Sequence, residues 1–424
     1  MPDSFECYRS ILKEELVPAL GCTEPIALAY GAAYCRSVLG SIPESIEVLC
    51  SSNIIKNVKS VSVPNCNGLK GIEAAVTVGA LYGNASLDLE VLKDVKENDV
   101  AEAIRYMYSH SIKVLPLKSE SKLHFIIHLF SSGQSASVEI KDSHTNVVGV
   151  IKNGNVLRTY LNTNSTLKRE KDSIDDHKMT VESIINYAEN EDIHILHSLF
   201  DVQLEDNWSI ANEGLRKSWG SGIGSIVEKN SFCGSLSIVE ALAAAGSDAR
   251  MSGCPMPVVI NSGSGNQGIT VSVPVIAYAK EHDMCVDDIL RALAISNLLS
   301  LYQKSSIGRL SAFCGAVSAA SGAGAAITWL AGGSLKQIED TLTNSLAIIS
   351  GIICDGAKPS CAGKIAVCVN AALIAHSMAM EDKSFIPGDG IVKDDVDKTV
   401  KGVGRIASIG MKETDDVILD VMLE

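Results

Sequence analysis

The feature that most constrains the fold is a long apolar segment, from about Cys233 to Ala379, that is rich in alanine, glycine and serine. Aromatic residues make up only 5% of the chain while 34 of its 424 residues are glycine, so small side chains must supply much of the core. Helices that are apolar on every side are buried, and small residues let their backbones approach closely. From Thr180 to the end we therefore predict closely packed helices.

A different pattern precedes this segment. Residues 88–160 contain an amphipathic helix at 99–109 and then short apolar segments separated by turn-forming sequences such as Ser-Ser-Gly-Gln and Lys-Asn-Gly-Asn. Such alternation predicts strands of a mainly antiparallel sheet. The predicted strands lie at 46–49, 58–63, 112–117, 123–130, 135–140 and 147–151, and the predicted N-terminal helices lie on either side of a break at 21–25 and at 68–81.

These patterns predict an α+β protein. One domain is mostly helical, with small buried helices, and a smaller α+β domain carries the mainly antiparallel sheet. We assign residues 1–45 and 175–424 to the helical domain and residues 46–174 to the smaller one. A polar segment at 160–180 with a mixed run of charges is predicted to be a linker.

The charge and the apolar segments limit the possible partners. A formal net charge of −14 argues against nucleic-acid binding, because no basic stripe is present to neutralise phosphates. The N-terminal sequence has no apolar core like that of a signal peptide. Residues 310–335 are long enough to cross a bilayer but consist mainly of alanine, glycine and serine, which favours a buried helix pair. We expect a cytoplasmic protein with no membrane partner.

Three of the twelve cysteines form the strongest candidate site. Without an export signal, a disulfide scaffold is not expected. Cys314, Cys354 and Cys361 lie in the most apolar third of the chain, and the last two bracket a polar loop that contains Gly356 and Lys358. Glycines beside cysteines are typical of iron–sulfur sites, where backbone N–H groups approach the sulfides. Three unrelated buried cysteines and a zinc site are the alternatives, although the short C-x2-C pairs of structural zinc are absent.

A second candidate site is the glycine-rich segment 261–268, which follows an apolar run. Its last six residues match the dinucleotide motif G-x-G-x-x-G, but the surrounding sequence indicates helices instead of a βαβ unit. Backbone N–H groups together with serine and asparagine side chains are suited to hold a substrate carboxylate. A plain glycine-rich turn is the alternative. The predicted substrate-binding residues are Asn261, Ser262, Gly263, Ser264, Asn266 and Gln267.

Cys22 is a third candidate, because it lies at the break between two helices in the sequence GCTEP. A cysteine beside a helix N-terminus is expected to have a lowered pKa, which makes Cys22 a possible base, nucleophile or ligand. A capping turn with Pro25 in the first helical turn is the alternative. Asn53 and Asn57 belong to a run of amides that either lines a polar pocket or makes turns. The nine histidines give no comparable signal.

Four segments taken together resemble the L-cysteine desulfidase family, which is related to the alpha chain of iron–sulfur L-serine dehydratases. They are GCTEPIALA at 21–29, NSGSGNQG at 261–268, SAFCGAVSAASGAGAA at 311–326 and GIICDGAKPSCAGK at 351–364. The resemblance implies that Cys314, Cys354 and Cys361 hold a [4Fe-4S] cluster in the helical, catalytic domain, with an open iron that takes the β-substituent of the substrate. It places Cys22 near that iron, in catalysis or transient ligation.

The resemblance further implies a carbon–sulfur lyase that eliminates sulfide from L-cysteine and gives pyruvate, ammonia and hydrogen sulfide. Cys22 as a thiolate is the first candidate for the base, ahead of Lys358. The final residues 421–424 carry no cysteine of the kind expected in L-serine dehydratases, so a dehydratase is the second choice. A non-catalytic iron–sulfur redox sensor is an alternative from another class, and the polar loop at 261–268 counts against it. We expect a cytoplasmic homodimer that acts on a small amino-acid substrate.

Overall fold

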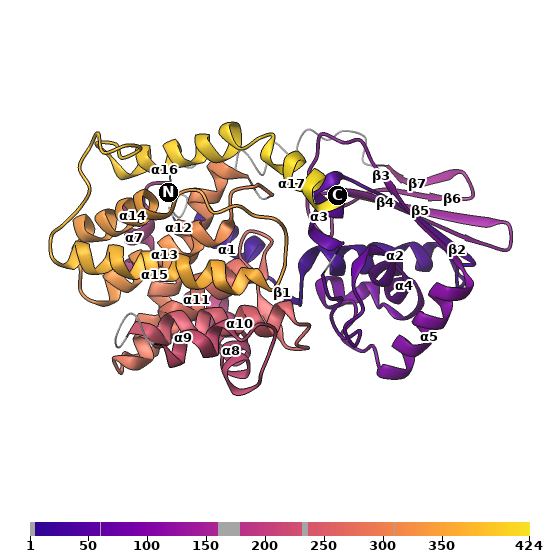
Figure 1. Cartoon of the computed structure of the whole chain (residues 1–424), viewed down its shortest axis with the longest axis horizontal. Helices are drawn as coiled ribbons and strands as arrows, with labels where there is room; N and C mark the ends of the chain where they lie inside the picture. Colours follow the sequence, from indigo (N-terminus) through magenta and orange to yellow (C-terminus); the bar gives the residue numbers. More distant parts are fainter. Residues whose placement is uncertain (1–4, 60, 160–178, 231–235, 309) are drawn as a thin grey trace.

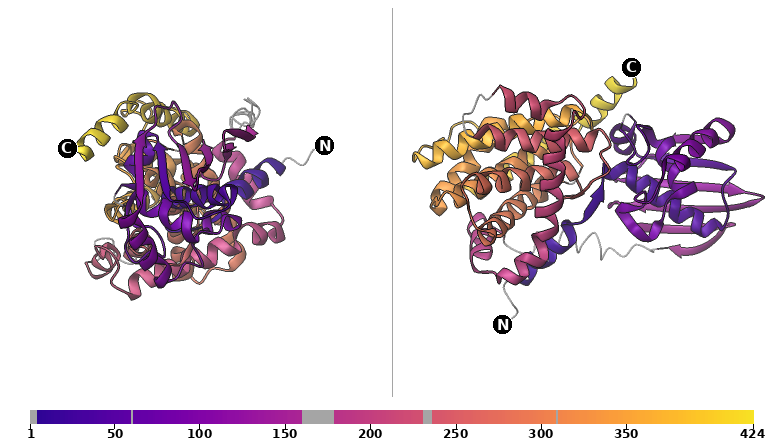
Figure 2. Two further views of the ribbon diagram at one scale, coloured as in Figure 1. Left: turned by 90° about the vertical axis from the view of Figure 1, so that its right-hand side faces the viewer. Right: turned by 90° about the horizontal axis from the view of Figure 1, so that it is seen from below.

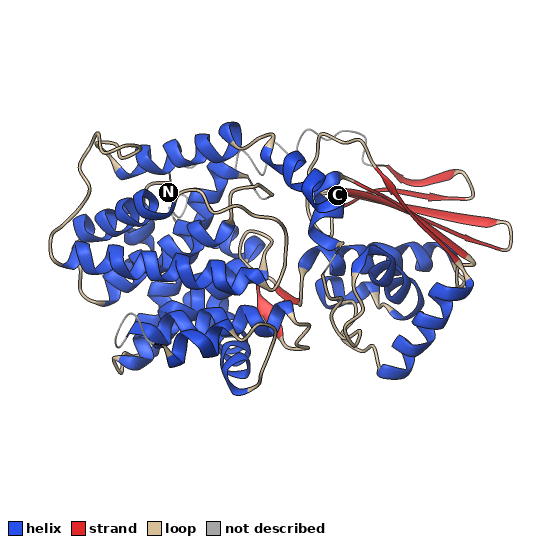
Figure 3. Ribbon diagram, in the orientation of Figure 1, coloured by secondary structure: helices blue, strands red, loops and turns tan. Residues whose placement is uncertain are grey.

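The computed structural model describes residues 5–59, 61–159, 179–230, 236–308 and 310–424. It has a helical part and, beside it, a part built on a β-sheet (Figures 1 and 3). The predicted α+β class is confirmed. The predicted linker at 160–180 lies outside the described residues except for Met179 and Thr180.

The sheet part combines helices with a mixed sheet. Its helices are α2 (Thr23–Leu39), α3 (Ser52–Val58), α4 (Gly71–Tyr82), η1 (Ala85–Glu90) and α5 (Glu97–Ser109). Its strands are β2 (Ser45–Cys50), β3 (Ser111–Pro116), β4 (His124–Ser131), β5 (Gln134–Lys141), β6 (Val147–Lys152) and β7 (Asn155–Thr159). Among the described residues the strand order is β3-β2-β4-β5-β6-β7, and only the β2–β3 pair is parallel.

Side-chain alternation and turn chemistry fix the register of this sheet. Val48, Ile127, Val138 and Val150 pair across four neighbouring strands and form one buried aliphatic row. The two-residue turn Ser132-Gly133 has positive φ at both positions, which suits the twist of a tight hairpin. Helix α2 lies on this face, with α4 packed against α2 (Figure 1). The buried face of the sheet therefore belongs to the same core as α2.

The helical part contains the remaining elements. They are α1 (Glu6–Glu15), α7 (Val181–Asn190), α8 (Ile193–Arg216), α9 (Ile223–Lys229), α10 (Ser237–Met251), α11 (Gly265–Glu281), α12 (Val286–Ile307), α13 (Gly315–Leu330), α14 (Leu335–Ile349), α15 (Ser360–Met380), α16 (Val396–Arg405), η3 (Ile406–Gly410) and α17 (Thr414–Leu423). The short strand β1 (Pro18–Leu20) pairs antiparallel with β8 (Pro257–Val259).

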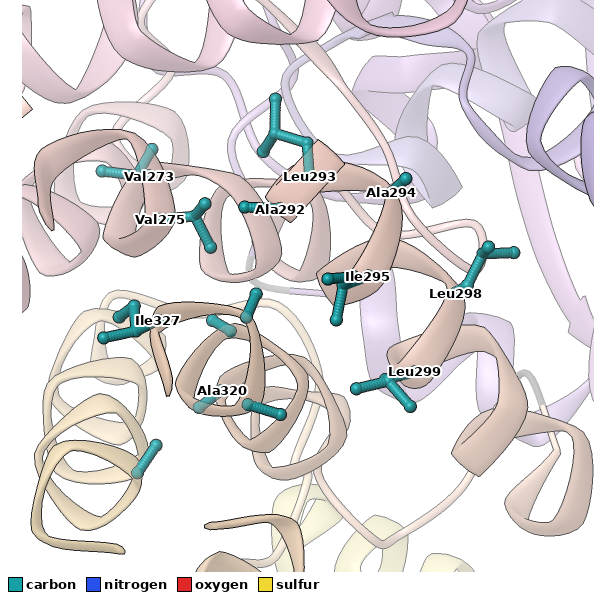
Figure 4. Packing of buried hydrophobic residues seen from close by; sticks show 14 of the residues in the cluster. Val273, Val275, Ala292, Leu293, Ala294, Ile295, Leu298, Leu299, Ala320 and Ile327 are labelled. Atoms are coloured by element: carbon teal, nitrogen blue, oxygen red, sulfur yellow. The ribbon is translucent and has the colours of Figure 1, made fainter. Parts of the chain in front are cut away.

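Helix α13 lies at the centre of the helical part and explains the excess of small residues. A Cβ atom on Gly322 would lie 2.7 Å from the carbonyl oxygen of Ser296 in α12, and one on Gly324 would lie 2.9 Å from the Cβ of Ala372 in α15. Only glycine permits this approach on both sides. Figure 4 shows the aliphatic side chains of α11, α12 and α13 that fill the remaining space.

The apolar segment considered as a possible membrane span forms the buried helix α13, preceded by a loop, instead of a helix pair. Among the described helices, α15 is long and apolar enough to cross a membrane by length and composition. More than half of its apolar window, 56%, is buried inside the protein, as in a core helix. Its buried residues belong to the same hydrophobic cluster as those of α13.

Two sequence predictions differ from the structure. The described residues within 58–63 do not form a strand, because Val58 ends α3 and Ser62 makes only an isolated bridge to Lys70. Strand β7 is not among the predicted strands. The buried residues of α2 belong to the hydrophobic cluster of the sheet, whereas those of α1 belong to that of the helices, so we propose a domain boundary before α2 in place of residue 45.

The chain passes between the two parts more than once. The segment after α1 leaves the helical part, pairs through β1, and enters the sheet part as α2, as the right-hand view of Figure 2 shows. At the other end of the chain, α17 extends from the helical part and packs against α3 (Figure 1). The junction is therefore closed by segments that come from both ends of the sequence.

Candidate active site

A cavity of about 700 Å³ lies at the junction of the two parts. Its wall combines the start of α2 and helix α3 from the sheet part with the starts of α11 and α13 and the 354–361 loop from the helical part. Eleven of the predicted site residues line this cavity: Cys22, Asn53, Asn57, Ser262, Gly263, Ser264, Asn266, Gln267, Cys314, Cys354 and Cys361. The structure thus brings together motifs that are separated by more than half of the chain.

Two of the three predicted ligand cysteines lie on neighbouring backbone segments. Phe313 and Ile353 form an antiparallel bridge, in which the N–H of Cys314 donates to Ile352 at 2.9 Å and the N–H of Cys354 donates to Ala312 at 2.7 Å. The bridge fixes the two cysteines side by side at the cavity.

Cys361 lies in the first turn of α15. The N–H of Lys358 donates to its sulfur at 3.4 Å. Gly356, in the same loop, has φ +93°, and a Cβ there would lie 3.0 Å from the carbonyl oxygen of Lys56. The glycine therefore lets the loop that carries Cys354 and Cys361 fit against α3.

The thiols of Cys314 and Cys354 interact directly and have opposite pKa shifts. The Cys314 thiol donates a hydrogen bond to the Cys354 sulfur, which raises the pKa of Cys314, and burial raises it further. The same hydrogen bond lowers the pKa of Cys354 to about 6, with help from the N–H of Gly356 and the charge of Lys56. Cys354 is therefore the cysteine best prepared to act as a thiolate near neutral pH.

The donor set suits a cluster better than a single ion. Among the described residues, no three His, Cys, Asp or Glu side chains are arranged to hold one metal ion. A [4Fe-4S] cluster binds its cysteines at separate irons, so the thiolates surround it instead of meeting at one point. Cys314, Cys354 and Cys361 face one cavity from two segments, so these are the residues that could hold such a cluster.

Four helix N-termini meet at the cavity. Cys22, Ser264 and Cys314 are the N-cap residues of α2, α11 and α13, and Cys361 lies in the first turn of α15. The unpaired N–H groups and the positive dipole end of a helix favour bound anions. A bound carboxylate is stabilised by this arrangement.

Cys22 belongs to a buried hydrogen-bond network centred on Glu24. The Cys22 thiol donates to Oε2 of Glu24 at 3.3 Å, and Nδ2 of Asn57 donates to Oε1 at 3.0 Å. Burial and the Glu24 charge raise the pKa of Cys22 well above its ordinary value, although Arg250 opposes the shift. The expected lowering of this pKa by the helix N-terminus is therefore wrong, because desolvation and a neighbouring carboxylate outweigh it.

The glycine-rich segment forms a loop between β8 and α11. Ser262 and Gly263 have φ of +49° and +74°, and the Ser264 hydroxyl caps α11 by accepting from the N–H of Gln267 at 3.4 Å. A Cβ on Gly268 would lie 2.0 Å from the carbonyl oxygen of Val259. Strand β8 pairs antiparallel with β1, so the βαβ unit of a dinucleotide site is not formed around this loop.

Two predicted site residues do not line the cavity. Asn261 is fully buried, and its side chain bonds to Asn297 at 3.0 Å and Ser300 at 3.1 Å, which anchors the loop on α12. Lys358 donates to the backbone carbonyl of Asp355, and burial lowers its pKa. The geometry gives Asn261 a structural position and turns the Lys358 amine onto the backbone of its own loop.

The structure adds polar side chains that sequence reasoning missed. Glu24, Lys56, Lys122, His144 and Arg250 all line the cavity. Arg250 had a signal in the sequence, because Asp248 and Arg250 are the only charges between Glu240 and Lys280. Glu24 had a signal as part of the GCTEP sequence around Cys22. Lys56, Lys122 and His144 had none, since only the tertiary fold brings them to the cavity.

Comparison with known proteins agrees with this arrangement. Residues 86–420 match the family model described as serine dehydratase alpha chain. A UPF0597 protein of Lachnoclostridium phytofermentans is 49% identical over 97% of this chain and 98% of its own length. UPF0597 proteins of Desulfitobacterium hafniense and Treponema denticola are 45% and 44% identical, each over 99% of this chain and at least 97% of their own lengths. This chain therefore belongs to the serine dehydratase alpha chain family and, within it, to the UPF0597 proteins.

Proposed function

We propose that this protein is an L-cysteine desulfidase. The observation that carries the proposal is that Cys314, Cys354 and Cys361 face one cavity together with the polar loop at 262–267. Membership of the serine dehydratase alpha chain family supports lyase chemistry on a small amino acid. The choice of sulfide as the leaving group rests on the resemblance of the four motifs to the desulfidases.

In this proposal Cys314, Cys354 and Cys361 hold a [4Fe-4S] cluster. When bound, the cluster supplies a Lewis-acidic iron for the thiolate of the substrate. The loop at 262–267 and the N-terminus of α11 hold the substrate carboxylate, so that the β-sulfur is directed toward the three cysteines. The protein thus fixes both ends of the amino acid before any bond breaks.

Cys22 and Glu24 act together as the base. The raised pKa keeps the Cys22 thiol protonated at rest, and Oε2 of Glu24, 3.3 Å away, is placed to accept that proton. The resulting Cys22 thiolate takes the α-proton of the substrate. Asn57 and Thr23 hold the Glu24 carboxylate through hydrogen bonds of 3.0 and 3.1 Å.

The overall elimination is balanced without an oxidant. The Cα–H and Cβ–S bonds break, a Cα–Cβ double bond forms, and sulfide leaves with the electron pair of the Cβ–S bond. The released aminoacrylate rearranges to an imine, and water hydrolyses the imine to pyruvate and ammonia.

L-Serine dehydration is the second candidate function, and the family match favours it. The two reactions differ only in the leaving group. Both require the same hold on the carboxylate and the same base, so substrate assays have to separate them.

The decisive experiment is anaerobic purification with iron and sulfide analysis, followed by assays of sulfide and pyruvate release from L-cysteine and L-serine. We expect about four irons per chain and sulfide release from L-cysteine. Pyruvate from L-serine alone would establish the dehydratase instead, and no product from either amino acid would refute both.

We also propose that the protein is a cytoplasmic homodimer. Size-exclusion chromatography with light scattering tests the dimer, and cell fractionation tests the location.

A further inference from the structure

Arg250 is a buried cation without a protein partner in the described part of the chain. It lies in the last turn of α10 and is 3% exposed. Its Nε is buried and has no hydrogen-bond partner among the described residues, and the side chain lines the cavity. Burying a guanidinium without a counter-ion costs free energy. A bound anion is therefore expected to serve as the partner of Arg250.

The backbone next to the guanidinium leaves space for it. A Cβ on Gly265 would lie 2.4 Å from Nε of Arg250 and 2.8 Å from its Cζ. The glycine at the start of α11 therefore leaves the space that the guanidinium occupies, beside the positive end of that helix. Placing a cation at this end is unfavourable for an empty site and favourable once an anion is bound between them.

No neighbouring carboxylate in the described residues neutralises Arg250. Asp248, two residues earlier, accepts from the N–H of Gly224 at 3.0 Å, which holds it at the start of α9. Glu24 is engaged by Cys22, Thr23 and Asn57. The anion that completes this site therefore has to come from the ligand.

Gln267 provides a second unpartnered group in the same cavity. Its Oε1 is buried without a hydrogen-bond partner in the described residues and lines the cavity. A Cβ on Gly315 would lie 2.4 Å from the Cδ of Gln267, so this amide lies against the residue that follows Cys314. Gln267 thus lies at the cysteine wall of the cavity that Arg250 also lines.

We propose that Arg250 binds the α-carboxylate of the substrate through its planar guanidinium and that Oε1 of Gln267 accepts a hydrogen bond from the adjacent α-ammonium group. A carboxylate matches the paired N–H donors of arginine, and a lysine does not reproduce that geometry. The inference rests on the proposed function in taking the substrate to be an α-amino acid, and it assigns the charged contact that the loop at 262–267 lacks.

The test compares L-cysteine with L-cysteinamide, which keeps every group except the carboxylate charge. Binding is measured by calorimetry on anaerobically purified protein, and KM and kcat are measured separately. We expect Arg250→Met to weaken L-cysteine binding about 100-fold and to leave L-cysteinamide binding unchanged, because only the charged contact is lost. Arg250→Lys should bind L-cysteine with an affinity between those of wild type and Arg250→Met. Its KM should change more than its kcat.

Arg36→Met serves as the control, because Arg36 donates only to the backbone carbonyls of Leu81 and Gly83 and does not line the cavity. It should leave the preference for L-cysteine over L-cysteinamide unchanged. If Arg250→Met does not fold, Arg250→Lys carries the same comparison with the charge retained.

Unchanged preference for L-cysteine in the Arg250 variants would overturn the assignment. The assignment would also be overturned if the wild-type protein bound none of L-cysteine, L-serine and pyruvate. Carboxylate binding that depends on Arg250 in a protein that releases no sulfide would support the assignment while refuting the desulfidase.

Discussion

At the scale of single residues, the role we propose for Cys22 is proton transfer rather than metal ligation. Its thiol already donates to Glu24, and its raised pKa disfavours a standing thiolate. We expect Cys22→Ser to lower sulfide release at least about 100-fold, the usual contribution of a positioned base, while most of the bound iron remains. Iron analysis and a sulfide assay on the same preparation check this.

Cys35→Ser is the matched control, because Cys35 is a fully buried cysteine of the same helix, α2, and does not line the cavity. It should leave the activity per iron unchanged. Full activity in Cys22→Ser would remove Cys22 from the mechanism, and loss of iron together with activity would make it a structural ligand.

The residues themselves show how far sequence reasoning reaches. Cys314, Cys354 and Cys361 are predicted as ligands because a polar loop between apolar helices is chemically unusual, and the structure places all three at one cavity. The pKa of Cys22 was predicted in the wrong direction, because the helix terminus is local and visible in sequence, while the burial that dominates the shift is tertiary. Asn261 belongs to a motif that faces the cavity, yet its own side chain turns to α12.

At the scale of elements, close helix contacts depend on individual glycines. A Cβ on Gly79 in α4 would lie 2.3 Å from the carbonyl oxygen of Ala29 in α2. Gly79→Ala should therefore force these helices apart and lower the free energy of unfolding by about 1–3 kcal/mol. Gly402, inside α16, has no atom within 4 Å of such a Cβ. Gly402→Ala should instead stabilise the protein by about 0.5–1 kcal/mol through helix propensity.

Urea unfolding of Gly79→Ala and Gly402→Ala measures the change in the free energy of unfolding for each. Equal changes in the two would mean that helix propensity, and not the approach of α4 to α2, governs the effect at Gly79.

The elements also differ in how far the sequence predicts them. Strands with alternating side chains and Gly-containing turns, such as β4 and β5, were predicted within a residue or two. The strand predicted at 58–63 failed because Val58 ends the helix α3, whose buried residues Ile54 and Val58 belong to the hydrophobic cluster of the sheet part.

At the scale of the whole molecule, an ion network beside the cavity joins α17 to α3 and to the residues just before β4. Asp415 in α17 accepts from Lys56 at 2.6 Å and from Lys122 at 2.9 Å. Burial raises the pKa of Asp415, but these hydrogen bonds outweigh it and the pKa is lowered. We expect Asp415→Asn to lower the free energy of opening of α17 by about 2 kcal/mol at pH 7, because Lys56 stays buried without its partner.

The pH dependence follows from the direction of the shift. A lowered carboxyl pKa contributes stability above the ordinary value of 3.8 and loses it as the pH falls through the folded value. Hydrogen exchange of α17 should therefore separate wild type from Asp415→Asn at pH 7 and by a smaller amount at pH 3. Asp416→Asn, at an exposed neighbour, is the control and should match wild type at both. A difference that does not shrink between pH 7 and pH 3 would mean that the charge is not the cause.

The position of the cavity between the two parts also predicts sensitivity to oxygen. Cys314, Cys354 and Cys361 are each partly exposed, so solvent and small oxidants reach the wall that carries them. A cluster with an iron open to substrate is open to oxidants by the same route, and exposure is among the main factors that set cluster chemistry.

We expect activity and iron content to fall together in air and to return with iron and a reductant under anaerobic conditions. L-Cysteine should slow the loss because it occupies the open position. Activity that survives prolonged aeration with a chelator would show that no labile cluster takes part, and the elimination proposed for this cavity would then require another electrophile.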